Sequence, residues 1–408
     1  MDYGLLGEKL GHSYSAIIHS RLGDYSYIHF EKKPEELDAF LKTGKFDGLN
    51  VTIPYKKAVI PYCAELTPQA QALGAVNTLV RKSDGSLLGH NTDYFGFETM
   101  LKHSGLSVSG KKVLVLGSGG ASNVAVAVLQ AHGAMTVVIS RQGQNNYENL
   151  HLHADAAVIV NATPVGMYPN TDAAPVDIAR FPRLEGVLDL IYNPARTRLL
   201  QAAEDRGLIT ENGLLMLVAQ AKEASQWFTG ESISDEKIFE IHQQLRQAEE
   251  NIILIGMPGS GKSTVGRLLA EKTGKVFVDA DALIPELAGK SIAEVFAEDG
   301  EDVFRQHETK ALAYLCKESE IVVATGGGCV MRPENEAILR QNGIIFCLER
   351  RLDSLEAEGR PLSQSVGVAE LYRIRQPKYA ELADYFIDNN GTPEEAATAI
   401  LKIWEELE

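Results

Sequence analysis

Cysteine is scarce in this 408-residue chain, and no run of 18 apolar residues occurs in it. The cysteines are Cys63, Cys316, Cys329 and Cys347, and no two of them form a C-x-x-C pair. This spacing favours free thiols, packed as small core residues in a reducing compartment, over a disulfide framework. The opening residues also lack the basic and apolar regions of a secretory signal, and a spanning helix needs about 20 apolar residues. We therefore expect a cytoplasmic protein with no membrane partner.

Basic residues are also few relative to acidic residues. The sequence has 39 Lys and Arg against 55 Asp and Glu, a net charge of −16 at pH 7. Binding to a nucleic-acid backbone normally needs a basic face, so we expect no nucleic-acid partner, and any anionic ligand must be held by local groups. Most of the acidic excess lies from Glu249 onward, although no linker rich in Gly, Ser or Pro marks the change. The length predicts two or three domains.

A glycine-rich motif with a lysine stands near the middle of the chain. Gly256-Met-Pro-Gly-Ser-Gly-Lys262-Ser263-Thr264 follows the apolar run Ile252 to Ile255 and has the spacing G-x-x-x-x-G-K-S. This spacing predicts a P-loop, in which backbone N–H groups hold the nucleotide phosphates, the lysine reaches the β and γ phosphates, and the serine hydroxyl ligates Mg²⁺. The predicted ATP-binding residues are Gly259, Ser260, Gly261, Lys262, Ser263 and Thr264.

From Lys112 onward, short β-branched runs alternate with helical segments, which is typical of parallel sheets covered by helices. Two sets of strands are predicted. The first is Val113–Leu116, Thr136–Ile139, Ala157–Val160 and Val187–Leu190, and the second is Ile252–Ile255, Val276–Val278, Ile321–Ala324, Ile344–Leu348 and Tyr385–Ile387. Between the sets we expect two helices, Leu214–Phe228, which is capped by Gly230, and Asp235–Gln247.

A second glycine loop follows the first strand of the earlier set. Gly117-Ser-Gly119-Gly120-Ala121-Ser122 opens a helix, which is the context of a dinucleotide fingerprint. The next strand ends in Ser140-Arg141 rather than in the acidic residue that holds a ribose 2′-hydroxyl. A guanidinium there can meet a 2′-phosphate, so the pattern favours NADP over NAD. The alternative is that Arg141 is only an exposed loop residue.

Three polar clusters precede this loop: His12-Ser13-Tyr-Ser15, Asn50-Val-Thr52-Ile-Pro-Tyr-Lys56 and Asn91-Thr-Asp93. Hydroxyl and amide side chains of this kind can bind the carboxylate and hydroxyls of a polyhydroxylated acid. A lysine and an aspartate brought together would supply a proton relay at a carbonyl that is being reduced. Taken singly, each cluster also suits a turn or a helix cap.

Taken together, residues 1 to about 246 resemble shikimate dehydrogenase. The motifs that carry the resemblance are Ser13-x-Ser15, Asn50 to Lys56, Gly74-Ala-Val-Asn77-Thr, Asn91-Thr-Asp93, Gly117 to Ser122, Asn161-Ala-Thr-Pro-Val-Gly-Met167, Asp189-Leu-Ile-Tyr192-Asn-Pro and Gly213 to Gln220. The resemblance implies that Lys56 and Asp93 are the catalytic pair. It implies that the substrate is held by Ser13, Ser15, Thr52, Asn77, Asp93, Tyr192 and Gln220. It also implies an NADP site that includes Gly117, Gly119, Gly120, Ala121, Ser140 and Arg141, with Thr163 and Met216 near the nicotinamide.

Several positions depart from the usual pattern of that family. His90 stands where an aspartate commonly precedes Asn-Thr-Asp, Tyr94 replaces a common glycine, and Tyr14-Ser15-Ala16 replaces Lys-Ser-Pro. Ser140-Arg141-Gln142 replaces Asn-Arg-Thr, so a single cation is predicted at the 2′-phosphate.

The region around the P-loop offers further polar motifs: Asp279-Ala-Asp281, Gly300 to Arg305, Gly326-Gly327-Gly328, Gly359-Arg360-Pro-Leu and Arg375-x-Pro-x-Tyr379. One aspartate can serve Mg²⁺ while the other orients a hydroxyl for attack on the γ-phosphate. Lys262, Mg²⁺ and Arg360 can compensate the charge of phosphoryl transfer. The triple glycine lets backbone N–H groups approach a ligand closely, although an ordinary turn has the same composition.

This set of motifs is similar to shikimate kinase over about residues 250 to 406. The resemblance implies that Asp281, Arg305 and Gly326, Gly327 and Gly328 bind shikimate, with Arg375 at its carboxylate. It implies a metal site at Ser263 and Asp279, and catalytic roles for Lys262, Asp281 and Arg360. The polar segment Leu352 to Val366, which contains Arg360, is expected to be a lid over ATP.

The predicted fold class is therefore α/β, with an α/β substrate domain, a Rossmann NADP domain and a P-loop domain of the nucleoside-monophosphate-kinase type. The predicted domains are 1–96 with 214–247, 97–213, and 250–406. We expect a bifunctional shikimate-pathway enzyme that reduces 3-dehydroshikimate with NADPH and phosphorylates shikimate with ATP and Mg²⁺. The alternatives are an NAD-dependent quinate/shikimate oxidoreductase fused to the kinase, one half decayed to a binding module, or a second half that phosphorylates another hydroxy acid such as gluconate.

Overall fold

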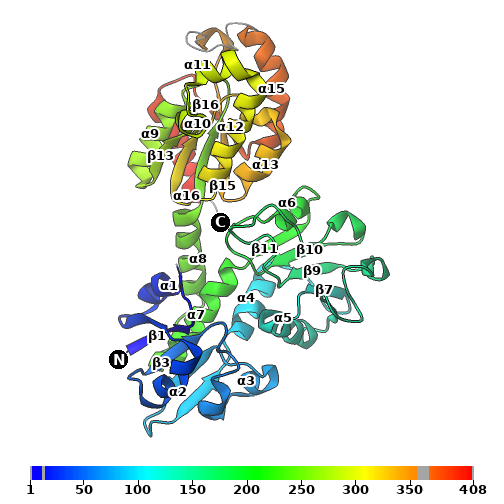
Figure 1. The fold of residues 1–408 in the computed structure, drawn as a ribbon, viewed down its shortest axis with the longest axis vertical. Helices are drawn as coiled ribbons and strands as arrows, with labels where there is room; N and C mark the ends of the chain where they lie inside the picture. The colour runs from blue at the N-terminus through cyan, green and yellow to red at the C-terminus, as the bar shows by residue number, and fades with distance from the viewer. Residues whose placement is uncertain (1, 12–13, 356–366, 407–408) are drawn as a thin grey trace. The chain divides into compact units, whose positions relative to one another are not determined.

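The computed structural model describes residues 2–11, 14–355 and 367–406. The chain divides into two compact units. Unit 1 contains Met1–Tyr192 and Ala202–Gln243, and unit 2 contains Asn193–Gln201 and Gln244–Glu408. The predicted α/β class is confirmed, because each unit is built from sheets covered by helices (Figure 1). The predicted domain boundaries within the first 247 residues stay a prediction.

The first sheet of unit 1 is mixed, with strand order β2-β1-β3-β5-β6-β4. Its strands are β1 (Asp2–Gly7), β2 (Ser26–Glu31), β3 (Gly48–Val51), β4 (Cys63–Leu66), β5 (Thr78–Arg81) and β6 (Leu87–His90). Its associated helices are α1 (Ser15–Leu22), α2 (Pro34–Thr43) and α3 (Pro68–Leu73). β5 runs antiparallel to both of its neighbours, and the other pairings are parallel.

The second sheet of unit 1 is fully parallel, with strand order β11-β10-β9-β7-β8. Its strands are β7 (Lys112–Leu116), β8 (Met135–Ile139), β9 (Val158–Asn161), β10 (Gly186–Asp189) and β11 (Ile209–Asn212). Four of these correspond to the predicted strands, with ends shifted by one residue at most. The sequence analysis missed β11, which is a short, partly exposed edge strand. The order reverses between β7 and β9, and such a switch point is where ligands bind in open parallel sheets.

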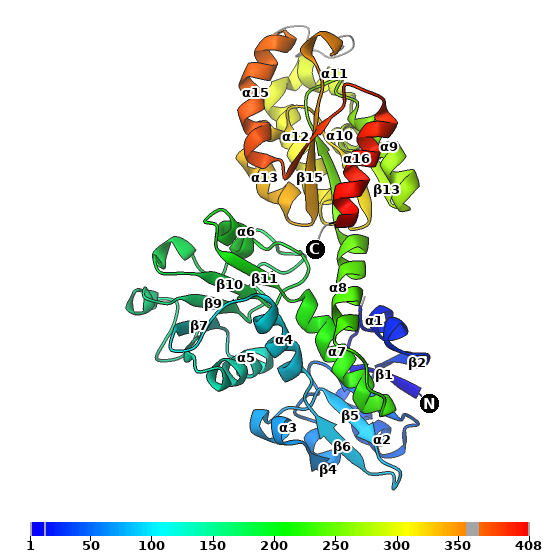
Figure 2. The same cartoon turned by 180° about the vertical axis from the view of Figure 1, so that it is seen from behind.

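Two helices of unit 1, α4 (Asp93–His103) and α7 (Leu214–Thr229), pack side by side between the two sheets (Figures 1 and 2). The contact is close at Gly96, where an added Cβ would lie 2.7 Å from the carbonyl oxygen of Met216. α7 ends at Gly230 in the left-handed conformation (φ 75°), as predicted. The other helices are α5 (Gly120–Ala131), α6 (Arg198–Glu204) and α8 (Glu236–Glu249), and the boundary between the units falls within α6 and within α8.

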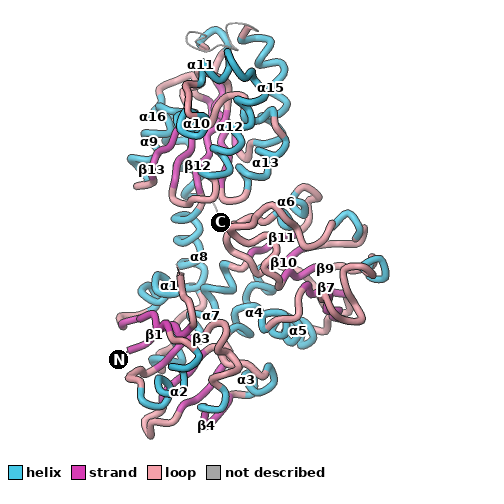
Figure 3. The backbone as a smooth tube through the Cα atoms, in the orientation of Figure 1, coloured by secondary structure: helices cyan, strands magenta, loops and turns pink. Residues whose placement is uncertain are grey.

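Unit 2 is a parallel sheet with strand order β13-β14-β12-β15-β16 and helices on both faces (Figure 3). Its strands are β12 (Asn251–Ile255), β13 (Val276–Asp279), β14 (Ile321–Ala324), β15 (Gly343–Glu349) and β16 (Tyr385–Asp388), and all five were predicted. Its helices include α9 (Lys262–Thr273), α10 (Ala280–Ala288), α11 (Ile292–Glu294), α12 (Gly300–Leu315), α13 (Pro333–Arg340), α15 (Val368–Leu382) and α16 (Pro393–Glu406). The central strand β12 is buried along its whole length, which explains its continuous apolar sequence.

All four cysteines are free thiols. Cys316, Cys329 and Cys347 are buried core residues, as predicted, and burial raises the pKa of each to about 12. Cys63 is half-buried. In the described part of the chain, no helix combines the length and apolarity needed to cross a bilayer.

Candidate active sites

The predicted catalytic pair of unit 1 lies together. Lys56 comes from the turn after β3, and Asp93 is the first residue of α4. The Lys56 Nζ atom is 2.6 Å from Asp93 Oδ2. The two side chains are 28% and 14% exposed, so the pair is largely buried but still open to a ligand. An ammonium and a carboxylate at this distance can hand a proton to an oxygen placed beside them.

Asn77 holds the catalytic carboxylate in place. Its Nδ2 donates to Asp93 Oδ1 at 2.9 Å, and its Oδ1 accepts the backbone N–H of Thr92 at 2.7 Å. The Thr92 hydroxyl in turn donates to Gln220 Oε1 at 3.3 Å, which connects α7 to this network. The structure therefore brings the predicted substrate residues Asn77 and Gln220 to one side of the Lys56–Asp93 pair.

The remaining predicted substrate residues of unit 1 lie on the first sheet and beside it. Ser15 begins α1 and is 9% exposed. The rings of Tyr14 and Tyr192 meet edge to face at 5.5 Å, which places Tyr192 beside the start of α1. Thr52 follows β3 and is half-buried. Ser13 lies outside the described residues.

The first glycine loop joins β7 to α5 at the switch point of the parallel sheet. Gly117 has φ 105°, a conformation that favours glycine, and an added Cβ would lie 2.9 Å from the carbonyl oxygen of Ala162. Gly119 caps α5 without a side-chain hydrogen bond, and Gly120 and Ala121 form the first turn. The backbone N–H groups of this turn thus face outward, as a bound pyrophosphate requires.

Thr163 lies close to the same loop, after β9. An added Cβ at Gly117 would lie 3.1 Å from its Cγ2, and its hydroxyl donates to Asn161 Oδ1 at 2.7 Å. Met216, the other residue predicted near the nicotinamide, lies in the first turn of α7. Because α7 also carries Gln220, one helix contributes to both the predicted cofactor and substrate sites.

Ser140 and Arg141 follow the carboxyl end of β8. The Ser140 hydroxyl donates to the carbonyl of Gln142 at 2.7 Å, which folds the turn back on itself. Arg141 is exposed beside it. An exposed guanidinium one strand away from the glycine loop fits the position of a 2′-phosphate.

The P-loop of unit 2 leaves β12 through glycines in left-handed or extended positive-φ conformations. Gly256, Gly259 and Gly261 have φ 136°, 84° and 93°. The Lys262 ammonium donates to the carbonyl oxygens of Gly256 at 2.9 Å and Met257 at 3.0 Å. It therefore lies over the mouth of the loop, where the β and γ phosphates of a nucleotide bind. Ser260 is buried within the loop.

A hydroxyl and a carboxylate form the predicted metal site. Ser263 Oγ donates to Asp279 Oδ2 at 2.8 Å, while Asp279 Oδ1 accepts the backbone N–H of Asp281 at 3.2 Å. Asp279 is thereby fixed at the start of α10 as its N-cap. Two oxygen donors at the end of a P-loop suit Mg²⁺, which usually takes one or two carboxylates together with phosphates and water.

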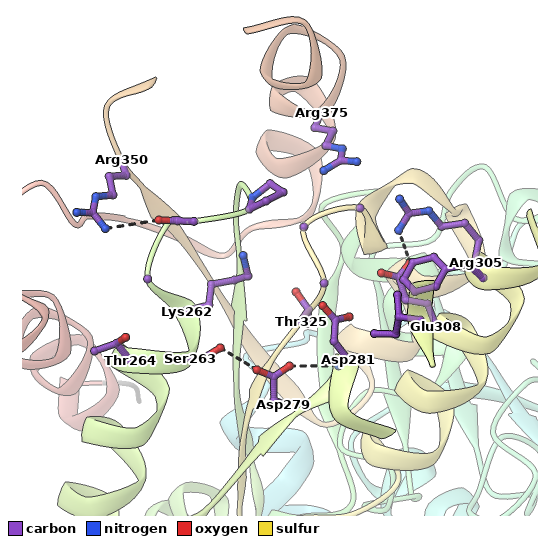
Figure 4. Close-up of a pocket in the computed structure, with 18 of the residues that line it drawn as sticks. Lys262, Ser263, Thr264, Asp279, Asp281, Arg305, Glu308, Thr325, Arg350 and Arg375 are labelled. Carbon is purple, nitrogen blue, oxygen red and sulfur yellow. Dashed lines mark hydrogen bonds and ion pairs between the residues drawn. The ribbon is translucent and has the colours of Figure 1, made fainter. Parts of the chain in front are cut away.

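The P-loop opens onto a cavity of about 510 Å³ (Figure 4). Its lining includes the predicted residues Gly259, Gly261, Lys262, Ser263, Thr264, Asp279, Asp281, Arg305, Gly326, Gly327, Gly328 and Arg375. Such a volume suits a nucleotide phosphate chain and a small second substrate. The structure therefore brings the P-loop and the distant polar motifs of unit 2 to one site.

Asp281 and Glu308 lie close to each other in the lining of this cavity, with Arg305 beside Glu308 (Figure 4). Burial, followed by the charge of Glu308, raises the pKa of Asp281 to about 6. Burial likewise raises the pKa of Glu308, although Arg305 Nη1 donates to Glu308 Oε2 at 2.8 Å. One oxygen of each carboxylate, Asp281 Oδ1 and Glu308 Oε1, is buried and has no hydrogen-bond partner among the residues that the structure describes. Buried, unsatisfied acceptors that line a cavity are suited to a ligand that brings hydroxyl donors.

The triple glycine is required by these neighbours. An added Cβ at Gly326 would lie 2.5 Å from Glu308 Oε1 and 2.7 Å from Asp281 Oδ1, and one at Gly328 would collide with the Arg305 guanidinium. Arg375, on α15, is 4% exposed and lines the same cavity. Arg360 lies outside the described residues, and of the predicted lid only Leu352 to Leu355 is described.

Sequence reasoning missed two charged residues of this cavity, Glu308 and Arg350. Glu308 is separated from Arg305 by three positions on α12, a spacing that places both on one face of the helix and could have revealed the pair. Arg350 follows β15, and its guanidinium is 3.5 Å from the carbonyl oxygen of Gly259 on the outer side of the P-loop. No local sequence pattern marks that residue, because the two strands meet only in the folded sheet.

Comparison with known proteins agrees with both halves of this description. The family model "Shikimate dehydrogenase substrate binding domain" matches residues 5–79, and the model "Shikimate kinase" matches residues 258–405. A curated relative, a shikimate dehydrogenase (NADP(+)) of Clostridium perfringens, is 34% identical over 266 residues, which cover 60% of this chain and 98% of the relative. The two resemblances predicted from the sequence are thus confirmed.

Solved structures resemble unit 1 as well. A chorismate mutase/shikimate 5-dehydrogenase fusion protein from Clostridium acetobutylicum has a TM-score of 0.57 and 36% identity, covering 60% of this chain and 97% of that chain. A shikimate 5-dehydrogenase from Thermus thermophilus, in complex with NADP(H) and shikimate, has a TM-score of 0.55 and 31% identity, covering 60% and 99%. A quinate dehydrogenase from Corynebacterium glutamicum, in complex with NAD, has a TM-score of 0.53 and 29% identity, covering 59% and 97%.

Proposed function

The chain belongs to the shikimate dehydrogenase family and carries a shikimate kinase domain after it, and we propose that it is a bifunctional shikimate-pathway enzyme that catalyses two consecutive reactions. The first reduces 3-dehydroshikimate to shikimate with NADPH. The second transfers the γ-phosphoryl group of ATP to the 3-hydroxyl of shikimate. The observation that supports this best is that each unit holds a set of groups suited to its own step: Lys56 and Asp93 in unit 1, and the P-loop with Asp281 in unit 2.

In the reductase, NADPH supplies the hydride that reduces the carbonyl carbon. The role of the chain is to orient the substrate and to supply a proton to the carbonyl oxygen. We assign proton donation to the Lys56 ammonium, which Asp93 holds at 2.6 Å. Asn77 fixes Asp93 through its amide and leaves the other carboxylate oxygen facing the lysine. Proton transfer by a positioned group of this kind contributes about 10² to 10⁴ in rate.

Preference for NADPH is assigned to Arg141. The dinucleotide fits at the first turn of α5, where Gly119 leaves the backbone N–H groups without a side-chain cap. From there the exposed guanidinium after β8 is in position for the 2′-phosphate. A curated relative described as NADP(+)-dependent and a solved relative in complex with NADP(H) support this assignment.

In the kinase, ATP with Mg²⁺ supplies the phosphoryl group. The geometry suits these ligands, since Ser263 and Asp279 present oxygens at the end of the P-loop and Lys262 lies at its mouth. We assign orientation of the attacking hydroxyl, and acceptance of its proton, to Asp281. Arg305 and the triple glycine hold shikimate on the same side of the cavity, and Arg375 holds its carboxylate. Arg360 is proposed to compensate phosphate charge from the lid.

We further propose that the substrate-binding part comprises residues 1–96 and 214–247, the NADP-binding part 97–213 and the kinase 250–406. The substrate part is discontinuous because α7 returns to pack on α4 and contributes Gln220 to the network around Asn77.

Single substitutions in the full chain test the division of labour. Lys56→Ala should lower the turnover of 3-dehydroshikimate by about 10² or more and leave phosphorylation of added shikimate unchanged. Lys262→Ala should have the opposite effect, and the neighbouring exposed Lys57→Ala is the matched control for the first variant. Normal reductase turnover in Lys56→Ala would refute the assigned proton donor.

One alternative first reaction is the oxidation of quinate with NAD. It is suggested by the similar solved structure of a quinate dehydrogenase in complex with NAD. Comparing NADPH with NADH, and shikimate with quinate, decides between the two. A higher kcat/KM for quinate with NAD than for shikimate with NADP would replace the proposed first reaction and leave the kinase assignment as it is.

A further inference from the structure

Tyr379 occupies a position in unit 2 that the proposed kinase mechanism does not use. It lies on α15 one helical turn after Arg375, is 3% exposed, and packs in the core cluster that includes Met257 of the P-loop and Cys329 after the triple glycine. A tyrosine buried to this extent needs a partner for its hydroxyl. The contacts of the Tyr379 hydroxyl are with the loops of the kinase site.

The hydroxyl donates to the carbonyl oxygen of Gly327 at 2.5 Å. Arg375 lies four positions earlier on α15, on the same face of the helix, and its positive charge acts on the Tyr379 hydroxyl. The sulfur of Met257 lies 4.0 Å away on the P-loop side. The hydroxyl thus holds the middle glycine of the triple-glycine loop from the helix face that also carries the arginine assigned to the substrate carboxylate.

The opposite face of Gly327 is closed by the P-loop. An added Cβ there would lie 2.6 Å from Pro258 Cδ, so the two loops are in direct contact at this point. Gly327 is therefore held at two points. Pro258 of the P-loop packs against it, and the Tyr379 hydroxyl donates to its carbonyl oxygen. Burial raises the pKa of Tyr379 above its usual range, so the hydroxyl stays a proton donor to this carbonyl at any working pH.

We propose that Tyr379 is a positioning residue of the kinase, which fixes the triple-glycine loop and Arg375 in the arrangement that binds shikimate. This inference rests on the proposed function of unit 2. Tyr379 acts through Gly327 and Arg375, while the nucleotide site is built from Lys262, which donates to the carbonyl oxygens of Gly256 and Met257, and from Ser263, which donates to Asp279. Its removal should therefore weaken shikimate binding far more than ATP binding.

The test is the full chain with Tyr379→Phe, which keeps the ring and removes one oxygen. Loss of the hydrogen bond that holds the Gly327 carbonyl predicts a rise in the KM for shikimate of about tenfold, with less than a twofold change in the KM for ATP. Tyr372→Phe is the matched control, since Tyr372 is half-buried on the same helix and packs against the same core cluster. It should change neither constant by more than twofold.

A double-mutant cycle separates positioning from general weakening. If Tyr379 acts through Arg375, combining Tyr379→Phe with Arg375→Lys should cost less shikimate affinity, measured by calorimetry, than the product of the two single effects. Independent effects, an unchanged KM for shikimate, or equal losses for shikimate and ATP would each overturn the proposal. Loss of cooperative unfolding in Tyr379→Phe would assign the hydroxyl to stability and would also overturn it.

These outcomes differ from failure of the proposed function. A wild-type chain that does not phosphorylate shikimate would refute the kinase assignment itself. A wild-type chain that phosphorylates shikimate, together with a Tyr379→Phe variant of unchanged shikimate KM, would refute only the role of the tyrosine.

Discussion

Replacing Asp281 with Asn should stabilise unit 2 at alkaline pH while it removes kinase activity. Asp281 lines the cavity of unit 2 close to Glu308, and burial raises its pKa from 3.8 to about 6. A carboxyl group with a raised pKa binds its proton more tightly in the folded chain than in the unfolded chain. Its contribution to stability is therefore greatest when it is protonated, and it is lost as the pH rises through about 6.

The size of the effect follows from the shift. A difference of about two pH units corresponds to roughly 3 kcal/mol, at about 1.4 kcal/mol per unit. This is an upper bound, because the cavity admits water. Asp281→Asn keeps the shape of the side chain without the charge, so it should raise the free energy of unfolding of unit 2 by up to about 3 kcal/mol at pH 8. The gain should shrink progressively between about pH 6 and pH 4.

Urea unfolding followed by tryptophan fluorescence measures this gain. The chain has two tryptophans, Trp227 in unit 1 and Trp404 in the core of unit 2. In a Trp227→Phe background, the emission of Trp404 reports on unit 2 alone. The exposed Glu405→Gln is the matched control, for which no pH-dependent gain is expected.

Kinase turnover is measured on the same samples. It should fall by about 10² or more in Asp281→Asn, and in the parent chain it should decline below about pH 6 as Asp281 becomes protonated. A variant that is less stable than its parent at pH 8, or equally stabilised at pH 8 and pH 4.5, would show that the buried charge is not the source of the shift. Stability gained without loss of turnover would remove Asp281 from the mechanism.

Three further substitutions have specific outcomes. Arg141→Ala should raise the KM for NADPH and leave that for NADH unchanged, and equal effects in steady-state kinetics would mean that the guanidinium does not bind the 2′-phosphate. Gly326→Ala should abolish detectable shikimate binding by calorimetry, because its Cβ would lie 2.5 and 2.7 Å from the two buried carboxylates of the cavity, and retained binding would place the ligand elsewhere. His90→Leu should destabilise unit 1 by about 1 to 3 kcal/mol, since it removes the imidazole whose Nδ1 is hydrogen-bonded to the Thr67 hydroxyl at 2.8 Å and whose ring packs on Trp227 at 4.5 Å. If the free energy of unfolding, measured through the fluorescence of Trp227, is unchanged in this variant, His90 does not stabilise unit 1.

The parallel sheets were the part of the fold that the sequence predicted best. Strands buried on both faces, such as β12, are continuous apolar runs bounded by glycine loops, so both their existence and their ends are visible. The edge strand β11 was missed, because Ile209–Asn212 is short, partly exposed and polar at three of its four positions. No strand was predicted in the first 111 residues, although six are present. There the sheet is mixed, and glycine and polar residues interrupt strands such as β1, β3 and β6, so neither alternation nor apolar runs stand out.

The candidate sites divide in the same way. Residues inside local motifs, such as Lys56, Asp93 and Asp281, could be named from sequence. Residues that depend on a tertiary neighbour could not: Glu308 becomes part of a site only because α12 faces Asp281. In the sequence, Tyr379 is visible only as the last residue of the motif Arg375-x-Pro-x-Tyr379. Its contact with Gly327 arises from packing between α15 and the loop after β14.

The most direct measurement is a single reaction that contains the purified full chain, 3-dehydroshikimate, NADPH, ATP and Mg²⁺. NADPH is followed by absorbance, and shikimate is resolved from shikimate 3-phosphate by mass. The proposed function predicts that NADPH is consumed and that the phosphorylated product accumulates. NADPH consumption that stops at shikimate would contradict the kinase step, and no consumption of NADPH would contradict the account as a whole.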